Sequence, residues 1–137
     1  MEIVIDSSVA MGWFAPAQAN ELTRGALIVI RDGAALVPAH FAHEVLRSLR
    51  RLHRRRSLGA LTVVDAIDEL TRLDIKQDER ATLALLHEIQ RLAVRTGLNS
   101  NDSAFLELAL RTGLPLASCD MALNAAAKAI GAKLFAP

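Results

Sequence analysis

Two short apolar runs in this sequence end in an acid. Residues 2–5 (EIVI) lead directly into Asp6, and residues 114–118 (LPLAS) are followed one residue later by Asp120. Ligands gather outside the carboxyl ends of the strands in open parallel sheets, so Asp6 and Asp120 are expected to lie close together. A carboxylate resists burial unless something pairs with it. The pattern therefore predicts a partner for Asp6 at that edge of the sheet.

Two further acids each have an ordinary explanation when taken alone. Asp102 lies at the start of a predicted helix, where a carboxylate can simply cap backbone N–H groups. Glu44 lies near the boundary of an apolar helix face, where a solvated glutamate is common. If all four acids converge, they repel one another and raise one another's pKa values unless a cation neutralises them. Hard oxygen ligands without clustered cysteines favour Mg²⁺ or Mn²⁺, which often join phosphates to protein carboxylates, so phosphodiester chemistry follows.

Short apolar runs alternate along the chain with longer helical patterns, which predicts an α/β domain with a mostly parallel sheet. The expected strands are residues 2–6, 35–38, 73–77, 114–118 and 133–135. The expected helices are residues 7–14 with Ser7 or Ser8 as the cap, Asn20 to Gly33, 39–56, a helix after the Thr62 and Asp65 capping box, 79–96, 101–112 and 121–131.

The composition limits the class of protein. A chain of 137 residues is expected to form one domain, residues 1–137, with a substantial core. Its 16 basic and 15 acidic residues give a net charge of +1, which by itself favours neither nucleic acid nor a membrane as partner. Glu2 and Asp6 interrupt any signal-like segment, and no apolar run reaches the roughly 18 residues of a membrane span, so a soluble cytoplasmic protein is expected.

Three stretches carry a resemblance to a known family. They are IVIDSSVAMGWF, LVPAHFAHEVLRSL and LNSNDSAFLELALRTGLPLASCD, at residues 3–14, 36–49 and 98–120. In the order and spacing of their acids they resemble PIN-domain ribonucleases, and most closely the VapC toxins of bacterial toxin–antitoxin pairs. The resemblance implies a three-layer α/β/α fold with a mostly parallel sheet of four to five strands.

The resemblance also implies a site. Asp6, Glu44, Asp102 and Asp120 would form its acidic pocket, with Asp6, Asp102 and Asp120 as ligands of Mg²⁺, for which Mn²⁺ would substitute. Glu44 would complete the ligand shell or help to activate the attacking water, and the sequence does not separate these roles. Bound Mg²⁺ would lower the pKa of that water and stabilise charge on the attacked phosphodiester.

Two hydroxyls belong to the same implied site. Ser8 would support the acids through hydrogen bonding, and Ser118 stands where the family often has Thr or Ser. His40 stands one helical turn before Glu44 and can approach the pocket. Asn124 is an amide where some relatives have another acid, which leaves open whether one metal ion or two would bind.

The resemblance further implies an activity and partners. It implies an endoribonuclease toxin that leaves a 5′-phosphate and a 3′-hydroxyl, a cognate antitoxin that blocks the pocket, and a homodimer. A PIN-domain nuclease of RNA processing and a catalytically silent PIN-like binding module stay open as alternatives. A phosphotransferase with Asp6 as nucleophile is disfavoured, because Ser8 occupies the place of that class's second acid, and no GxGxxG follows residues 2–6 to indicate dinucleotide binding.

An arginine-rich segment, RSLRRLHRRR at residues 47–56, has six arginines and no acid. At helical spacing, Arg47, Arg50, Arg51 and Arg54 form a stripe that could attract RNA phosphates. It could equally be a solvated face that covers apolar surface with its methylene groups, or a contact for an acidic antitoxin segment or a second copy of the chain.

Overall fold

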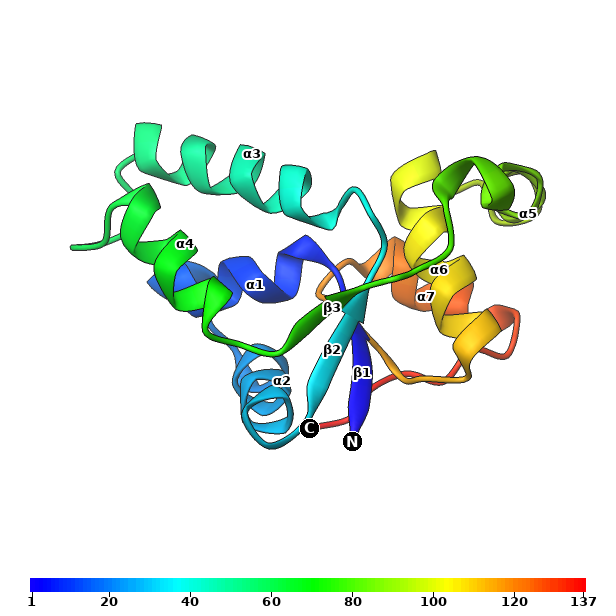
Figure 1. Ribbon diagram of the computed structural model, residues 1–137, viewed down its shortest axis with the longest axis horizontal. Helices are drawn as coiled ribbons and strands as arrows, with labels where there is room; N and C mark the ends of the chain where they lie inside the picture. Colours follow the sequence, from blue (N-terminus) through cyan, green and yellow to red (C-terminus); the bar gives the residue numbers. More distant parts are fainter.

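Four parallel strands form the centre of the fold, in the order β3-β2-β1-β4 (Figure 1). The computed structural model describes residues 1–137. The strands are β1 (Glu2–Ile5), β2 (Ala34–Val37), β3 (Ile75–Gln77) and β4 (Leu116–Ala117). The helices are α1 (Ser7–Phe14), the 3₁₀ turn η1 (Pro16–Gln18), α2 (Glu21–Asp32), α3 (Phe41–Arg54), α4 (Val63–Thr71), α5 (Thr82–Thr96), α6 (Ser100–Thr112) and α7 (Met121–Ala129).

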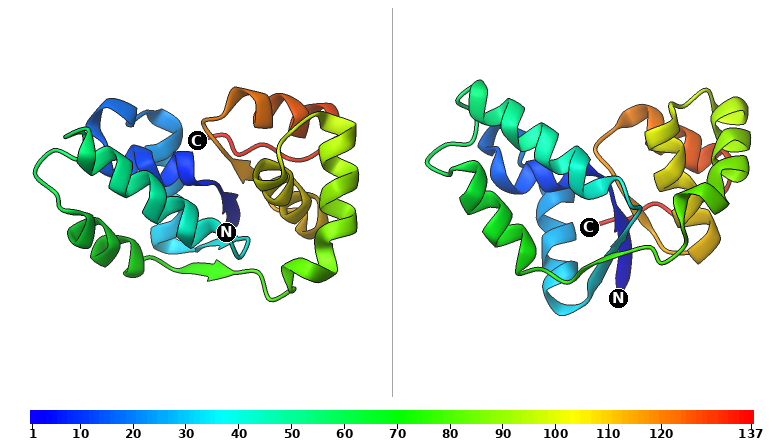
Figure 2. Two further views of the ribbon diagram at one scale, coloured as in Figure 1. Left: turned by 90° about the horizontal axis from the view of Figure 1, so that it is seen from above. Right: turned by 45° about the horizontal axis from the view of Figure 1, so that its top comes forward.

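The helices cover both faces of the sheet. Figure 2 shows α1 to α4 on one side of the strands and α5 to α7 on the other. This placement of the helices follows from the connections between the strands. Each connection between two successive parallel strands contains two α-helices, and these helices pack back on the sheet. This three-layer α/β/α arrangement confirms the predicted fold class.

The register of the sheet decides which residues meet at its carboxyl edge. Ile3, Val4 and Ile5 are fully buried, as expected for the β-branched residues of a central parallel strand. On one side Val4 pairs with Leu36 of β2, and on the other Ile5 pairs with Ala117 of β4. Asp6 and Ser118 are the next residues of β1 and β4, so they leave the sheet side by side.

Most predicted helix ends are confirmed. The side chain of Asn20 caps α2, and Thr62 with Asp65 forms the predicted capping box of α4. Gly97 and Gly113 end α5 and α6 with φ values of 75° and 70°, the left-handed conformation that glycine adopts without a steric cost.

The cap of α1 is not a serine. The carboxylate of Asp6 accepts hydrogen bonds from the backbone N–H groups of Ser8 and Val9, so Asp6 takes the capping position predicted for Ser7 or Ser8. The reason is that helix α1 begins directly after β1, which leaves Asp6 as the last extended residue before the first helical turn. Both serine hydroxyls are therefore free for other partners.

Several boundaries differ from the prediction. Strand β3 begins at Ile75 instead of residue 73, β4 is shorter than the predicted 114–118, α3 ends at Arg54 instead of residue 56, and α7 ends at Ala129 instead of residue 131. Residues 133–135 form only an isolated bridge, Leu116 to Leu134, because β4 itself is two residues long and offers no longer ladder. Helix α3 begins at Phe41 instead of residue 39. The backbone N–H of Phe41 donates to the carbonyl of Pro38, so a turn precedes the first residue of the helix. Helix α5 begins at Thr82 instead of residue 79, because the preceding residue is extended. None of the helices is long and apolar enough to cross a bilayer.

Close packing holds α1 against α2. A Cβ atom added at Gly12 would lie 2.3 Å from the Cγ2 atom of Thr23, whose side chain is fully buried. The indole N–H of Trp13 donates to the carbonyl of Thr23 at 2.8 Å. Glycine at position 12 therefore permits the close contact between α1 and α2.

Candidate active site

Asp6 is the most buried acid of the predicted set, with 4% of its surface exposed. The hydroxyl of Ser8 donates to Oδ1 at 2.5 Å and that of Ser118 donates to Oδ2 at 2.5 Å, so each carboxylate oxygen has a serine partner. Burial raises the pKa of Asp6 above its ordinary value in spite of these hydrogen bonds, and the negative charge of Glu44 adds to the rise. The two serines therefore hold the carboxylate of Asp6 in one orientation, but they do not fully offset the cost of burying its negative charge.

Glu44 lies in the first turn of α3 and faces α1. The hydroxyl of Ser7 donates to its Oε1 at 2.5 Å, across a separation of 37 residues. Its other oxygen, Oε2, lies 3.4 Å from Nε2 of His40, and both of these buried atoms lack a hydrogen-bond partner. Burial opposes ionisation of Glu44, but His40, Ser7 and the charge of Arg47 together lower its pKa below the ordinary value. A solvated surface glutamate, the alternative raised by the sequence, does not describe it.

Asp102 lies in the first turn of α6, but it does not cap the helix. The side chain of Asn99 is the cap and accepts the N–H of Asp102 at 2.8 Å. The carboxylate of Asp102 itself is half-buried and accepts no hydrogen bond from the protein. The capping explanation of this acid is therefore excluded.

Asp120 follows β4 and caps α7 through a bond from the N–H of Leu123 to its Oδ1 at 2.9 Å. The hydroxyl of Ser118 accepts the N–H of Asp120 at 2.9 Å, so one serine side chain contacts two of the acids. Asn124 donates from its side-chain amide to the backbone carbonyl of Ser118 at 2.8 Å. That amide thus holds the strand end in place and is occupied by a structural bond.

The four acids converge. Burial, followed by the charges of Asp120, Asp6 and Glu44 in that order, raises the pKa of Asp102 to about 6, while His40 acts in the opposite direction. The acids come from the ends of β1 and β4 and the first turns of α3 and α6, all at the carboxyl edge of the sheet, in the upper part of Figure 1. The structure brings together the residues that the sequence singled out.

The chemistry of this cluster suits a hard divalent cation. Carboxylate oxygens are the ligands that Mg²⁺ and Mn²⁺ prefer, and Glu44 Oε2 is a buried oxygen without a partner. No three of the His, Cys, Asp and Glu side chains stand close enough together to enclose one ion. Because Mg²⁺ keeps several of its waters and takes only one or two carboxylates directly, an open cluster of this kind still fits it.

The predicted arginine stripe is exposed. Arg47, Arg50, Arg51 and Arg54 lie on the outer side of α3, whose inner side buries Phe41, Val45, Ser48, Leu49 and Leu52. None of these arginines takes part in an ion pair. The stripe lies on the same helix as Glu44 and begins one turn after it.

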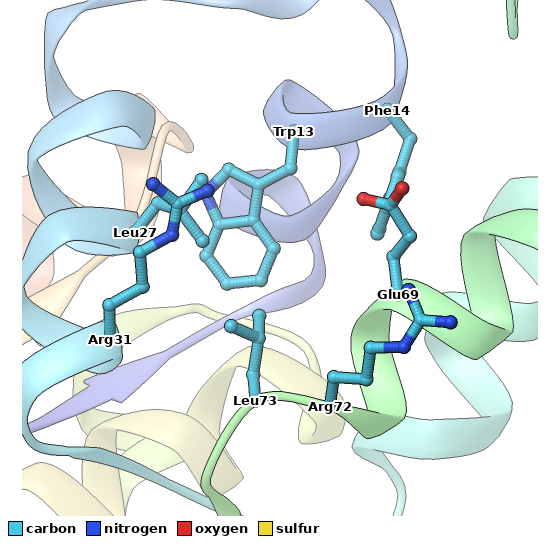
Figure 3. Close-up of a pocket in the computed structure, with 7 residues that line it drawn as sticks. All are labelled: Trp13, Phe14, Leu27, Arg31, Glu69, Arg72 and Leu73. Carbon is cyan, nitrogen blue, oxygen red and sulfur yellow. The ribbon is translucent and has the colours of Figure 1, made fainter.

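A cavity of about 370 Å³ lies away from the acids, between α1, α2 and α4 (Figure 3). Trp13 and Leu73 form apolar parts of its wall, and the guanidinium groups of Arg31 and Arg72 stand at its sides. None of the four acids lines it. This pocket is thus separate from the acidic cluster.

Two contacts of the site were missed from the sequence. The sequence predicts Ser7 only as a helix cap, yet its hydroxyl donates to Glu44. The backbone N–H of Cys119 donates to the hydroxyl of Ser8 at 2.9 Å. A pair of serines directly after a strand-terminal acid was the available signal for the first contact. No sequence signal indicates the second, which depends on how β4 pairs with β1.

Comparisons with known proteins agree with this geometry. No curated protein sequence gives a significant match. The crystal structure of PAE2754 from Pyrobaculum aerophilum is similar in fold, with a TM-score of 0.68 at 22% sequence identity, over 92% of this chain and 84% of that one. Residues 3–129 match the PIN domain. The chain therefore belongs to the PIN-domain family, whose members are typically nucleases.

Proposed function

We propose that this protein is a Mg²⁺-dependent endoribonuclease of the VapC kind, the toxin of a type II toxin–antitoxin pair. The observation that carries the proposal is the convergence of four carboxylates, which together with burial raises the pKa of Asp102 to about 6. Carboxylates that repel one another at the carboxyl edge of a parallel sheet favour a bound cation over an empty cluster. Membership of the PIN-domain family supports hydrolysis of a nucleic acid.

Asp6, Asp102 and Asp120 would hold the cation. Ser8 and Ser118 each occupy one oxygen of Asp6 and so restrict its rotation, which presents the carboxylate in one orientation. When bound, the cation supplies a Lewis acid that activates water and neutralises charge on the attacked phosphate.

Glu44 would have a different task. Its lowered pKa keeps it ionised at neutral pH, and its Oε2 has no hydrogen-bond partner to displace. An ionised carboxylate in that condition can accept a hydrogen bond from the attacking water and so orient it toward the phosphate. His40, 3.4 Å away, would hold Glu44 in position.

A cognate antitoxin, a homodimer and products with a 5′-phosphate and a 3′-hydroxyl stay predictions from the family resemblance. Two alternatives remain alongside the toxin, namely a PIN-domain nuclease of RNA processing and a silent binding module. Induced expression separates the first alternative, because a toxin arrests growth and leaves new 5′ ends in cellular RNA. Titration with Mg²⁺ or Mn²⁺ separates the second, since a silent module with a stable fold would show no affinity.

The direct test measures cleavage of RNA by the purified protein in Mg²⁺. The Asp102→Asn variant should lose at least about a hundredfold in rate, because it removes an acid proposed to hold the cation. Asp68→Asn, on the exposed side of α4, is the matched control and should cleave as fast as the wild type. Equal rates for Asp102→Asn and the wild type would overturn the proposal.

A further inference from the structure

Six arginines between residues 47 and 56 form a dense group of positive charge on the molecule. All six are exposed, and no carboxylate lies within ion-pair distance of any of them. Elsewhere Lys76, Arg91 and Arg111 do have acidic partners. Guanidinium groups gathered without internal counter-charges favour a polyanionic ligand, because association releases their repulsion and the ligand's own counterions.

The arginines are ordered with respect to the acidic cluster. Counting along α3 from Glu44, Arg47, Arg51 and Arg54 follow at steps of three, seven and ten residues, so they share one side of the helix. At 1.5 Å per residue, the line from Glu44 to Arg54 is about 15 Å long. Figure 1 shows α3 leading away from the carboxyl edge of the sheet over α1.

The surface beside this line is hollowed. One hollow of about 310 Å³ is lined by His43, Leu46, Arg47, Arg50 and Arg54. A second, of about 290 Å³, is lined by Arg50, His53, Arg54 and Val63. Arg50 and Arg54 border both hollows, so their guanidinium groups stand between two spaces whose walls also include the side chains of Leu46 and Val63.

We infer that the outer side of α3 is a binding track for single-stranded RNA, which leads one strand's phosphates from the arginines to the acidic cluster. The inference rests on the proposed ribonuclease function and adds the direction and extent of the substrate contact. A single line of guanidiniums along one helix suits one strand. The hollows beside it offer apolar and imidazole surface to unstacked bases, which are the parts of RNA that proteins reach most easily.

The test separates binding from cleavage. A fluorescein-labelled oligouridylate of about 20 nucleotides is titrated with the protein in EDTA, without turnover, at several KCl concentrations. The Arg50→Gln, Arg51→Gln, Arg54→Gln triple variant leaves Arg47 in place, because the charge of Arg47 acts on Glu44. Three lost phosphate contacts should lower the slope of log K against log salt by about 2 and raise Kd at least about tenfold.

The control removes the same charge elsewhere. Arg24→Gln, Arg80→Gln, Arg95→Gln alters three exposed arginines outside α3 that also lack ion pairs. Its Kd and salt slope should match those of the wild type. Cleavage in Mg²⁺ should show a raised KM and a kcat within about twofold for the α3 variant, since the acids are untouched.

Each outcome decides one of the two ideas. Equal RNA affinity for the α3 variant and the control overturns the track, whether or not RNA is cleaved. Labelled polyglutamate is titrated in the same way as a second probe. The track is also overturned if the α3 variant loses affinity for polyglutamate but not for the oligouridylate, which would mark a surface for an acidic protein. RNA binding that depends on the α3 arginines, without cleavage in Mg²⁺ or Mn²⁺, keeps the track and overturns the proposed ribonuclease function.

Discussion

Replacing Asp102 by Asn should stabilise the protein when no divalent cation is present. The folded state holds the ionised carboxylate less readily than the unfolded chain does, because burial and the charges of Asp120, Asp6 and Glu44 raise its pKa from 3.8 to about 6. Between these two values the folded protein binds more protons than the unfolded chain, so stability falls as pH rises through this window. Above it the full penalty is present, and below pH 3.8 it is absent.

The magnitude follows from the shift. One pKa unit corresponds to about 1.4 kcal/mol, so a rise of about two units sets an upper limit of about 3 kcal/mol. Solvent screening of the half-buried carboxylate and its favourable place at the N-terminus of α6 reduce this to about 1–2 kcal/mol. The Asn side chain removes the charge at nearly the same volume, so packing changes little.

Urea unfolding followed by the fluorescence of Trp13, the single tryptophan, measures the effect. In EDTA at pH 7.5 the variant should exceed the wild type by about 1–2 kcal/mol, and most of the difference should be gone at pH 4. Adding Mg²⁺ at pH 7.5 should stabilise the wild type more than the variant, since ligands that bind only the folded state raise its stability. The reasoning is refuted if the variant is no more stable at pH 7.5, or if its gain is the same at both pH values.

Three further predictions concern single contacts that stabilise the fold. Ser118→Ala removes a hydrogen bond to the buried carboxylate of Asp6 and should lower the urea unfolding free energy by about 1–3 kcal/mol. The control Ser100→Ala, at an exposed serine, should lower it by less than about 0.5 kcal/mol. Equal losses for the two variants would contradict the contact between Ser118 and Asp6. Arg111→Ala removes the ion-pair partner of Glu107, which is buried, and of Asp78, which is nearly buried, and should lower the urea unfolding free energy by about 3 kcal/mol. Arg91→Ala, which breaks an exposed ion pair, should lower it by at most about 1 kcal/mol. A loss at Arg111 as small as that at Arg91 would contradict the importance of the Arg111 ion pairs. Gly12→Ala should lower Tm through overpacking worth about 1–3 kcal/mol, while a raised Tm, which helix propensity alone predicts, would contradict the close helix contact.

Local patterns in the sequence were enough to predict the class of fold. The apolar β-branched run before Asp6 predicts a buried parallel strand, and Asn20, Gly97 and Gly113 mark helix ends because capping acts within a few residues of the chain. The meeting of the acids at one edge could also be predicted, since parallel strands place their carboxyl ends together. Strand propensity, helix capping and the topology of parallel sheets are therefore enough to predict the fold class and the edge of the sheet at which the acids lie.

The detailed contacts of the site depend on the tertiary structure. Ser118 reaches Asp6 across 112 residues because Ile5 and Ala117 share a register, and the two-residue length of β4 leaves residues 133–135 with only a bridge. Likewise Asp6 displaces the serines as the cap of α1, and Ser7 is thereby available to Glu44.

The sequence by itself therefore determined which residue types stand at the ends of the strands and the starts of the helices. The packing of α1, α3 and α6 around the edge of the sheet decided which hydroxyl serves which acid and how strongly the acids repel one another. It also decided that none of the α3 arginines forms an ion pair. The physical reason is that propensity and capping are properties of adjacent residues. Hydrogen bonding, burial and charge interaction depend on distances that only the folded chain defines.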